Sequence, residues 1–250
     1  MKVPRHAVKL VRRIFASFGY SISPQPQGIG GNAFADMASL VRTDHPVIFD
    51  VGANAGQSIE NFRLWFKDAE IHSFEPSPAT FQLLQRNVAS DARIRPWNYA
   101  LGAHQEDAEF LENTLPECSS FLPLGESGWG SVARKIKVPV RTVDDFCTEH
   151  GIGRINILKT DTQGYELEVF KGADRMFRQG AVDLVFCEMA IAEQYAGAPS
   201  FGQLYDYLVS QDFRLVSFYS IFYEQSLAAW TDGLFIHRSR LTLCSNGEES

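Results

Sequence analysis

Val47-Ile48-Phe49-Asp50-Val51-Gly52-Ala53-Asn54-Ala55-Gly56 joins an apolar strand to a turn that contains two glycines. The spacing of its polar and glycine residues is D-x-G-x-N-x-G. Open α/β sheets hold nucleotide-like cofactors with a carboxylate at the end of a strand and glycines that let a ligand approach the backbone. The stretch therefore predicts a cofactor-binding turn at the carboxyl end of a buried strand.

This spacing differs from the dinucleotide pattern G-x-G-x-x-G, in which the glycines direct a helix N-terminus at a pyrophosphate. Here Asp50 lies beside the turn. Its charge would repel an anion and would attract a ligand that carries an amino group. The turn therefore favours a cationic or zwitterionic ligand.

Strands and helices alternate outward from this turn. Apolar runs predict strands at 47–51, 70–74, 94–100, 136–140, 155–160, 182–187, 213–218 and 234–237, and helical periodicity predicts helices at 57–67, 80–88, 142–150, 165–172 and 201–210. The alternation is typical of an α/β fold with a mostly parallel, doubly wound Rossmann-like sheet. The segment 111–135 is rich in proline and glycine, and we expect an irregular loop there that acts as a lid.

We expect three parts in the chain of 250 residues. Residues 1–31 form a basic amphipathic helix and a linker, 32–240 form one domain, and 241–250 form a flexible tail. Two interpretations of the helix stay open: it packs its apolar side on the domain, or it contacts a membrane surface or a partner.

Composition excludes several classes of protein. The net charge of -7 argues against a general nucleic-acid binder, which needs basic surface to displace phosphate counterions. The four cysteines form no C-x-x-C pair, so the sequence predicts neither a zinc knuckle nor a disulfide framework. A reducing cytoplasm is the expected location. No stretch approaches the roughly 18 apolar residues of a membrane span.

Carboxylates stand at the ends of four predicted strands: Asp50, Glu75, Asp161 and Glu188. Ligands of open α/β sheets bind outside the carboxyl ends of the strands, so we expect these four side chains to line one crevice. Glu75 lies about 20 residues past the glycine turn, where a carboxylate accepts the hydroxyls of a ribose. A cofactor with an amino group and a ribose would satisfy both ends of this site.

The chain resembles a class I S-adenosylmethionine-dependent methyltransferase of the FkbM family. The resemblance is carried by Phe49–Gly56, Phe74–Pro78, Asn98–Leu101, Val143–Phe146, Leu158–Ala173, Tyr195–Phe201 and Asp232–Phe235. It implies a seven-stranded sheet whose last strand is antiparallel. It also implies methylation of a hydroxyl, often on a sugar, a glycan or a secondary metabolite.

The resemblance also implies roles for individual residues. Asp50, Gly52, Asn54 and Gly56 would surround the methionine part of S-adenosylmethionine. Glu75 would hold the ribose. Ser77 and the segment Asn98–Leu101, which includes Ala100, would border the adenine. The pair Gln163-Gly164 departs from the Glu-Gly of many members, which argues against an acid or base at position 163.

Asp161, with Lys159 two residues before it, is the expected catalytic residue on the acceptor side. It would act as a general base, or would join Glu188 and Asp232 in binding Mg²⁺. In a third interpretation Asp161 only caps the helix that follows it.

Two other functions stay open at this stage. A nicotinamide-dependent oxidoreductase uses the same kind of sheet, although Asn54 and Asp50 replace the features that its cofactor needs. A non-catalytic cofactor-binding protein would also retain the fold. The acceptor itself, a glycan, a lipid-linked sugar or a small metabolite, has no recognisable code in the sequence.

Overall fold

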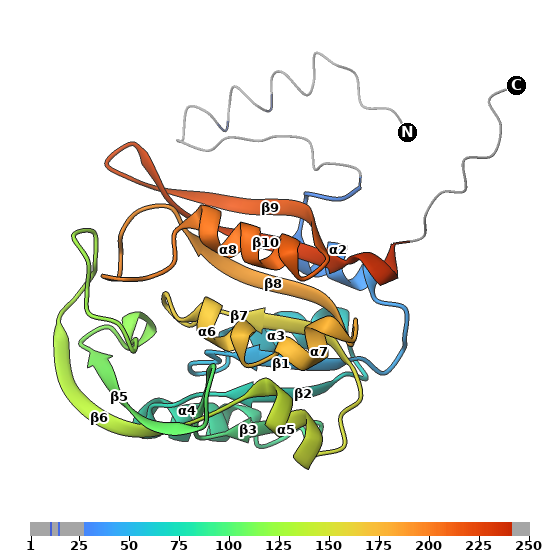
Figure 1. Ribbon diagram of the computed structural model, residues 1–250, viewed down its shortest axis with the longest axis horizontal. Coiled ribbons are helices and arrows are strands. Elements are labelled where there is room, and N and C mark those ends of the chain that lie inside the picture. The colour runs from blue at the N-terminus through green and yellow to red at the C-terminus, as the bar shows by residue number, and fades with distance from the viewer. Residues whose placement is uncertain (1–10, 12–14, 16–27, 242–250) are drawn as a thin grey trace, which may run out of the picture.

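A computed structural model describes residues 11, 15 and 28–241. The expected basic helix and most of its linker lie outside these residues, and so does the expected tail after residue 241. The described chain forms a central sheet covered by helices on both faces, with a smaller sheet at one side (Figure 1).

The central sheet has seven strands in the order β3-β2-β1-β7-β8-β10-β9. Its strands are β1 (Val47–Val51), β2 (Glu70–Phe74), β3 (Ile94–Trp97), β7 (Ile155–Thr160), β8 (Val182–Ala190), β9 (Phe213–Glu224) and β10 (Leu227–His237). The first five strands of that order pair in parallel, and β10 pairs antiparallel with both β8 and β9. The predicted α/β sheet with an antiparallel last strand is confirmed.

Two layers of helices enclose the sheet. One core joins the sheet to α5 (Val143–Glu149), α6 (Glu166–Lys171), α7 (Asp174–Arg178) and α8 (Phe201–Ser210). The other joins it to α2 (Ala33–Leu40), α3 (Gln57–Trp65) and α4 (Pro78–Val88). Because both faces of the inner strands are covered, β7 is buried along its whole length, which explains its continuous apolar run. Helix α2 was not among the helices predicted from the sequence.

The structure corrects the expected loop over 111–135. Its ends are strands, β5 (Glu106–Asn113) and β6 (Val132–Arg141), which form a second sheet with β4 (Ala100–Leu101). Only 114–131 connect β5 to β6, and this connection includes the short 3-10 helix Pro116–Cys118. The segment predicted as one strand over 94–100 is divided between β3 and β4.

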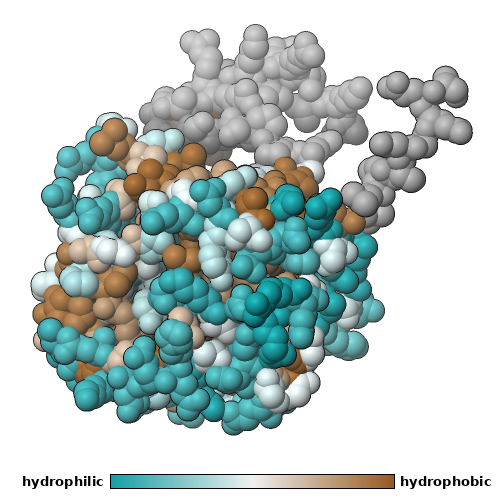
Figure 2. All heavy atoms as spheres, in the orientation of Figure 1, coloured by the Kyte–Doolittle hydropathy of each residue, from teal (hydrophilic) through white to brown (hydrophobic). Residues whose placement is uncertain are grey.

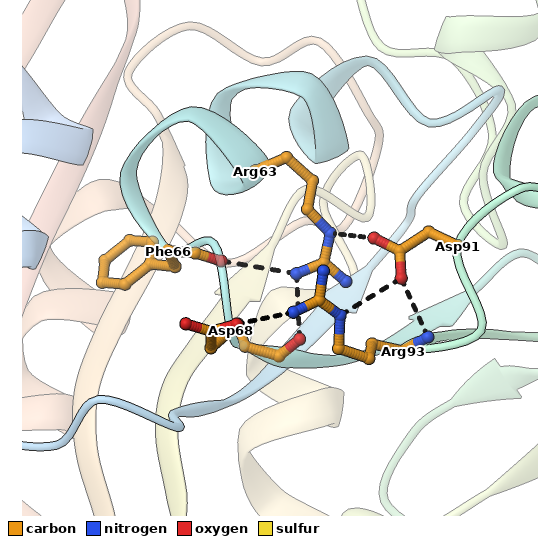
Figure 3. A network of polar contacts seen from close by, with 6 residues as sticks. Arg63, Phe66, Asp68, Asp91 and Arg93 are labelled. Carbon is orange, nitrogen blue, oxygen red and sulfur yellow. Dashed lines mark hydrogen bonds and ion pairs between the residues drawn. The ribbon is translucent and has the colours of Figure 1, made fainter.

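A polar network holds together the end of the sheet at which β2 and β3 begin, opposite to the carboxyl ends of the strands (Figure 3). The Arg63 guanidinium, near the end of α3, donates to the carbonyl oxygens of Phe66 and Ala69 and lies 2.6 Å from Asp91 Oδ2. The Asp91 carboxylate also accepts the Arg93 amide at 3.0 Å, just before β3. These contacts fix the starts of β2 and β3 relative to each other. The carboxyl ends of the two strands therefore lie side by side.

Among the described residues, no helix has the length and apolar character needed to cross a bilayer.

Candidate active site at the carboxyl ends of the parallel strands

The glycine turn after β1 packs tightly between its neighbours. The Gly52 and Ala53 amides donate to the Phe74 carbonyl oxygen, and the Asp161 amide donates to the Val51 carbonyl oxygen. Gly52 has φ +74°, and a Cβ there would collide with the Asp161 carbonyl oxygen. Glycine is therefore required at this position, because the turn touches the end of β7 directly.

Asp50 and Lys159 form a buried ion pair at the centre of the site. They are register partners on β1 and β7, and Lys159 Nζ lies 2.9 Å from Asp50 Oδ1. Burial alone would lower the pKa of the Lys159 ammonium, but the Asp50 and Asp161 carboxylates outweigh burial and raise this pKa above its ordinary value. Asp50 is fully buried, and its Oδ2 has no hydrogen-bond partner in the described part of the chain.

Glu75 follows β2 and accepts two backbone amides. Asn54 N donates to Oε2 at 3.0 Å, and Ser77 N donates to Oε1 at 2.9 Å. Burial raises the pKa of the carboxyl to about 7, although both amide bonds oppose this shift. Glu75 thus links the glycine turn to the start of α4 and ionises near neutral pH.

Ser77 and Asn98 shape the loops behind Glu75. The Ser77 hydroxyl caps α4 and donates to Glu112 Oε1 at 2.5 Å. The Asn98 side-chain amide donates to the Glu75 and Pro76 carbonyl oxygens at 2.9 and 3.1 Å. Both side chains are therefore engaged with the protein itself.

Asp161 lies just past β7, with a half-exposed side chain. Gln163 Nε2 donates to Asp161 Oδ1 at 2.8 Å, and the Tyr195 hydroxyl donates to Gln163 Oε1 at 2.7 Å. Lys159 Nζ lies 3.7 Å from Asp161 Oδ2. Gln163 thus presents its amide N–H to Asp161 and its amide oxygen to Tyr195, whose hydroxyl also lies 3.2 Å from the Cys118 carbonyl oxygen. No role for Gln163 was predicted from the sequence.

Two more carboxylates face each other beside Asp161. Glu188 lies within β8, rather than after it as expected, and is the register partner of Asp232 on β10. Burial, with the neighbouring carboxylates, raises the pKa of Glu188 well above its usual value and that of Asp232 to about 6. Over the described residues, no group of three His, Cys, Asp or Glu side chains is arranged to hold a metal ion. The predicted Mg²⁺ set of Asp161, Glu188 and Asp232 therefore has no support from the geometry.

A cavity of about 340 Å³ lies at the carboxyl ends of the parallel strands. Its volume is within the range of roughly 300–1,000 Å³ that is typical of ligand sites. Of the residues predicted from the sequence, the cavity is lined by Gly52, Asn54, Glu75, Ala100, Lys159, Asp161 and Glu188. Five others lie outside its lining: Asp50, Gly56, Ser77, Asn98 and Asp232. A second cavity, of about 460 Å³, shares Lys159, Asp161 and Glu188 and also contains Asp232.

Aromatic side chains close the far end of the first cavity. Trp129 and Trp230 both line it and pack edge to face, with ring centroids 5.4 Å apart. The loop 114–131 that carries Trp129 is tied to the loop after β8, where the Gly125 amide donates to the Gln194 carbonyl oxygen and the Ala196 amide to the Pro123 carbonyl oxygen. The two loops therefore form one continuous wall.

The residues present fit the cofactor that the resemblance implies. Glu75 borders the cavity with a carboxylate suited to hydroxyl groups, and Asp50 holds a buried oxygen without a hydrogen-bond partner in the described chain. The glycine turn allows close approach of a ligand to its backbone.

Comparisons with known proteins agree with this geometry. The model of the methyltransferase FkbM domain matches residues 50–215. The 2-O-methyltransferase NoeI of Sinorhizobium fredii is 25% identical over 194 residues, which cover 72% of this chain and 77% of NoeI. The hexuronic acid methyltransferase AglP of Haloferax volcanii is 27% identical over 50% of this chain and 49% of its own length. The 31-O-demethyl-FK506 methyltransferase FkbM of Streptomyces tacrolimicus is 24% identical over 51% of this chain and 59% of its own length.

Proposed function

This chain belongs to the FkbM family of S-adenosylmethionine-dependent methyltransferases, and on that premise we propose that it methylates a hydroxyl oxygen of a sugar, glycan or small metabolite. The observation that carries the proposal is the position of Asp161, whose side chain borders both cavities. The names of NoeI and FkbM, both O-methyltransferases of similar sequence, support an oxygen acceptor.

The cofactor end of the site would be formed by Gly52, Asn54, Glu75 and Ala100, which line the first cavity. Glu75 would accept the ribose hydroxyls, and Asp50 would attract the amine of the methionine part from behind the turn. When bound, S-adenosylmethionine supplies a methyl group on a positively charged sulfur, which needs no further activation. The contribution of the chain is therefore position and proton transfer.

Asp161 would accept the proton of the acceptor hydroxyl. Its Oδ1 is occupied by Gln163 Nε2, which leaves Oδ2 for the acceptor. Lys159, between Asp50 and Asp161, keeps positive charge beside this carboxylate. Glu188, whose pKa is raised by burial, would face the acceptor beside Asp161.

Three further expectations belong to the same proposal. The acceptor would be a small molecule or glycan rather than a nucleic acid, since the chain carries a net charge of -7. The enzyme would act in the cytoplasm, where its unpaired Cys118, Cys147 and Cys187 stay reduced. Dependence on Mg²⁺ stays a prediction from the sequence, and chelation of the purified enzyme tests it.

Methyl transfer from labelled S-adenosylmethionine to a panel of glycosides and small alcohols tests the proposal. The Asp161→Asn variant should lose about 100-fold or more of the turnover while it still binds S-adenosylhomocysteine. Asp145→Asn, at an exposed position of α5, is the matched control and should keep full activity. Full activity of Asp161→Asn would exclude the proposed base, and transfer to no oxygen acceptor would count against the proposed acceptor class.

A further inference from the structure

Trp129 presents an aromatic ring to the first cavity. The residue is 45% exposed and lines the cavity together with Trp230. Trp230 is the single ring that Trp129 contacts among the residues that the structure describes, and the two ring planes meet edge to face at 80°. An edge-to-face contact covers at most one face of an indole ring, so at least one face of Trp129 is free of other rings.

Neighbouring strands hold this ring in a defined orientation. Trp129 Nε1 donates to Glu224 Oε1 at 3.2 Å, at the end of β9. Trp230, on β10, is itself stacked on Phe222 with ring centroids 4.8 Å apart. Two strands of the central sheet thus position a ring that belongs to the loop 114–131.

Asn113, the last residue of β5, fixes the backbone at Trp129. Its Nδ2 donates to the Trp129 carbonyl oxygen at 2.8 Å, and its Oδ1 accepts the Leu115 amide at 3.0 Å and the Ser131 amide at 3.2 Å. Gly130 has φ +74°, and a Cβ there would collide with Asn113 Oδ1. One buried side chain therefore joins both ends of the loop. The ring is preorganised, which lowers the cost of binding a ligand.

Polar side chains of the two connected loops also line the cavity. Glu117 lies in the short 3-10 helix of the loop 114–131, and Gln194 lies in the loop after β8 that is hydrogen-bonded to it. Figure 2 shows hydrophobic side chains at the left of the molecule, on the side where Figure 1 places β5, β6 and their connection. An aromatic face bordered by carboxylate and amide groups suits a sugar ring, which has apolar faces and hydroxyls on its rim.

The aromatic end of the cavity lies at a distance from the proposed base. On β10, Trp230 is two residues from Asp232, whose register partner on β8 is Glu188. Two residues of a strand extend roughly 7 Å. An acceptor whose reacting hydroxyl lies at Asp161, beside Glu188, must therefore extend well past that hydroxyl to reach Trp129.

We propose that Trp129 is a specificity-determining residue that stacks on a second sugar ring of the acceptor, so that the preferred acceptor is a disaccharide or a longer glycan. This assignment rests on the proposed function, since it concerns the ring next to the one that is methylated. The free face of Trp129 would contact the C–H face of that ring, and Glu117 and Gln194 would bind its hydroxyls. Trp129 therefore acts on the affinity for the acceptor.

Methyl transfer to three matched sets of acceptors tests the proposal. The sets are methyl glycosides of common hexoses and deoxyhexoses, disaccharides of several linkages that contain the same sugars, and phenyl glycosides of the same sugars. For a sugar that is methylated, kcat/KM should be at least about tenfold higher for a disaccharide than for the methyl glycoside. The phenyl glycoside should gain less, because it offers no hydroxyls to Glu117 and Gln194.

Substitutions of Trp129 show whether this residue causes the preference. Trp129→Ala removes the stacking face and should reduce the preference for disaccharides about tenfold, through a higher KM rather than a lower kcat. Trp129→Phe keeps a ring and should retain part of the preference. Trp65→Ala is the matched control and should keep all of it, since Trp65 is 43% exposed at the end of α3 and lines neither cavity. Titration with S-adenosylhomocysteine shows that each variant is folded.

The outcomes separate this proposal from the proposed function. Equal kcat/KM for methyl glycosides and disaccharides would overturn the role of Trp129 and leave the O-methyltransferase intact, and so would a preference that Trp129→Ala retains. A phenyl glycoside that exceeds every disaccharide would show that the aromatic end binds an apolar group instead of a sugar. Transfer to no glycoside, by a protein that binds S-adenosylhomocysteine, would overturn both this proposal and the sugar acceptor on which it rests.

Discussion

Lys159 is the one cation in the linings of both cavities, and it stands among carboxylates. Its partner Asp50 is fully buried, so the ion pair is held in a medium of low dielectric constant. Removal of one member leaves the other as an uncompensated buried charge. The pair should therefore matter for stability as well as for binding.

Replacement of Lys159 by Met should lower the free energy of unfolding by about 3–5 kcal/mol, since Asp50 is left unpaired. The double variant Asp50→Asn with Lys159→Met should recover more than half of this loss. Lys171→Met is the control, because the exposed Lys171–Glu168 pair contributes at most about 1 kcal/mol. Urea unfolding measures all four proteins. A cost for Lys159→Met as small as that of the control would mean that the Asp50–Lys159 pair is dispensable.

Glu75 predicts how cofactor binding depends on pH. Burial raises the pKa of Glu75 to about 7, and only its ionised form accepts two ribose hydroxyls. Below about pH 7, the affinity for S-adenosylhomocysteine should therefore rise by up to about tenfold per pH unit. Above about pH 7 the affinity should level off. Calorimetric titration should show this slope in the wild type and a flat profile in Glu75→Gln. An affinity that falls as the pH rises would contradict the assigned role.

At the scale of elements, the apolar inner strands were predictable, whereas of β5 and β6 in the second sheet only 136–140 was predicted as a strand. Strands such as β7 are covered on both faces, so they appear in the sequence as continuous apolar runs. The first residues of β6 are exposed and include Arg134 and Lys135, so this part of the strand has the composition of a surface loop. Its partner β5 also begins with exposed residues, so this part of β5 likewise has the composition of a surface loop.

Some features of the candidate site could also be predicted from the sequence, and others could not. Glu75 and Asp161 could be placed because each directly follows an apolar strand of the parallel sheet. The bond from Tyr195 to Gln163 joins two loops that are distant in sequence, and no local pattern announces it. The ion pair of Asp50 with Lys159 depends on the register between β1 and β7, which the sequence does not show.

The network in Figure 3 gives a prediction at this scale. Asp91→Ala removes the partner of Arg63 and the acceptor of the Arg93 amide, so it should lower the free energy of unfolding by about 1–2 kcal/mol. Thermal unfolding measures the change. The affinity for S-adenosylhomocysteine should stay the same, because the network lies at the opposite edge of the sheet. A large loss of affinity would show that the two edges are coupled.

At the scale of the whole molecule, the strand order explains why these residues meet. β1 and β7 lie side by side at the middle of the sheet, and they bring the glycine turn against Asp161. β2 adds Glu75 on one side, and β8 with β10 adds Glu188 and Asp232 on the other. In the proposed function, Glu75 would lie at the cofactor end of this site, Glu188 and Asp232 at the acceptor end, and Asp161 between them.

Titration of S-adenosylhomocysteine into the wild type and into Glu75→Ala tests this arrangement most directly, with Glu117→Ala as a control at another wall of the same cavity. The wild type should bind one equivalent and should not bind NAD. Glu75→Ala should bind at least about tenfold more weakly, because the loss of hydrogen bonds to a charged group costs roughly 1.5–3 kcal/mol, and Glu117→Ala should bind as the wild type does. Equal affinity of Glu75→Ala and the wild type, in a folded protein, would show that the cofactor does not bind at this edge of the sheet.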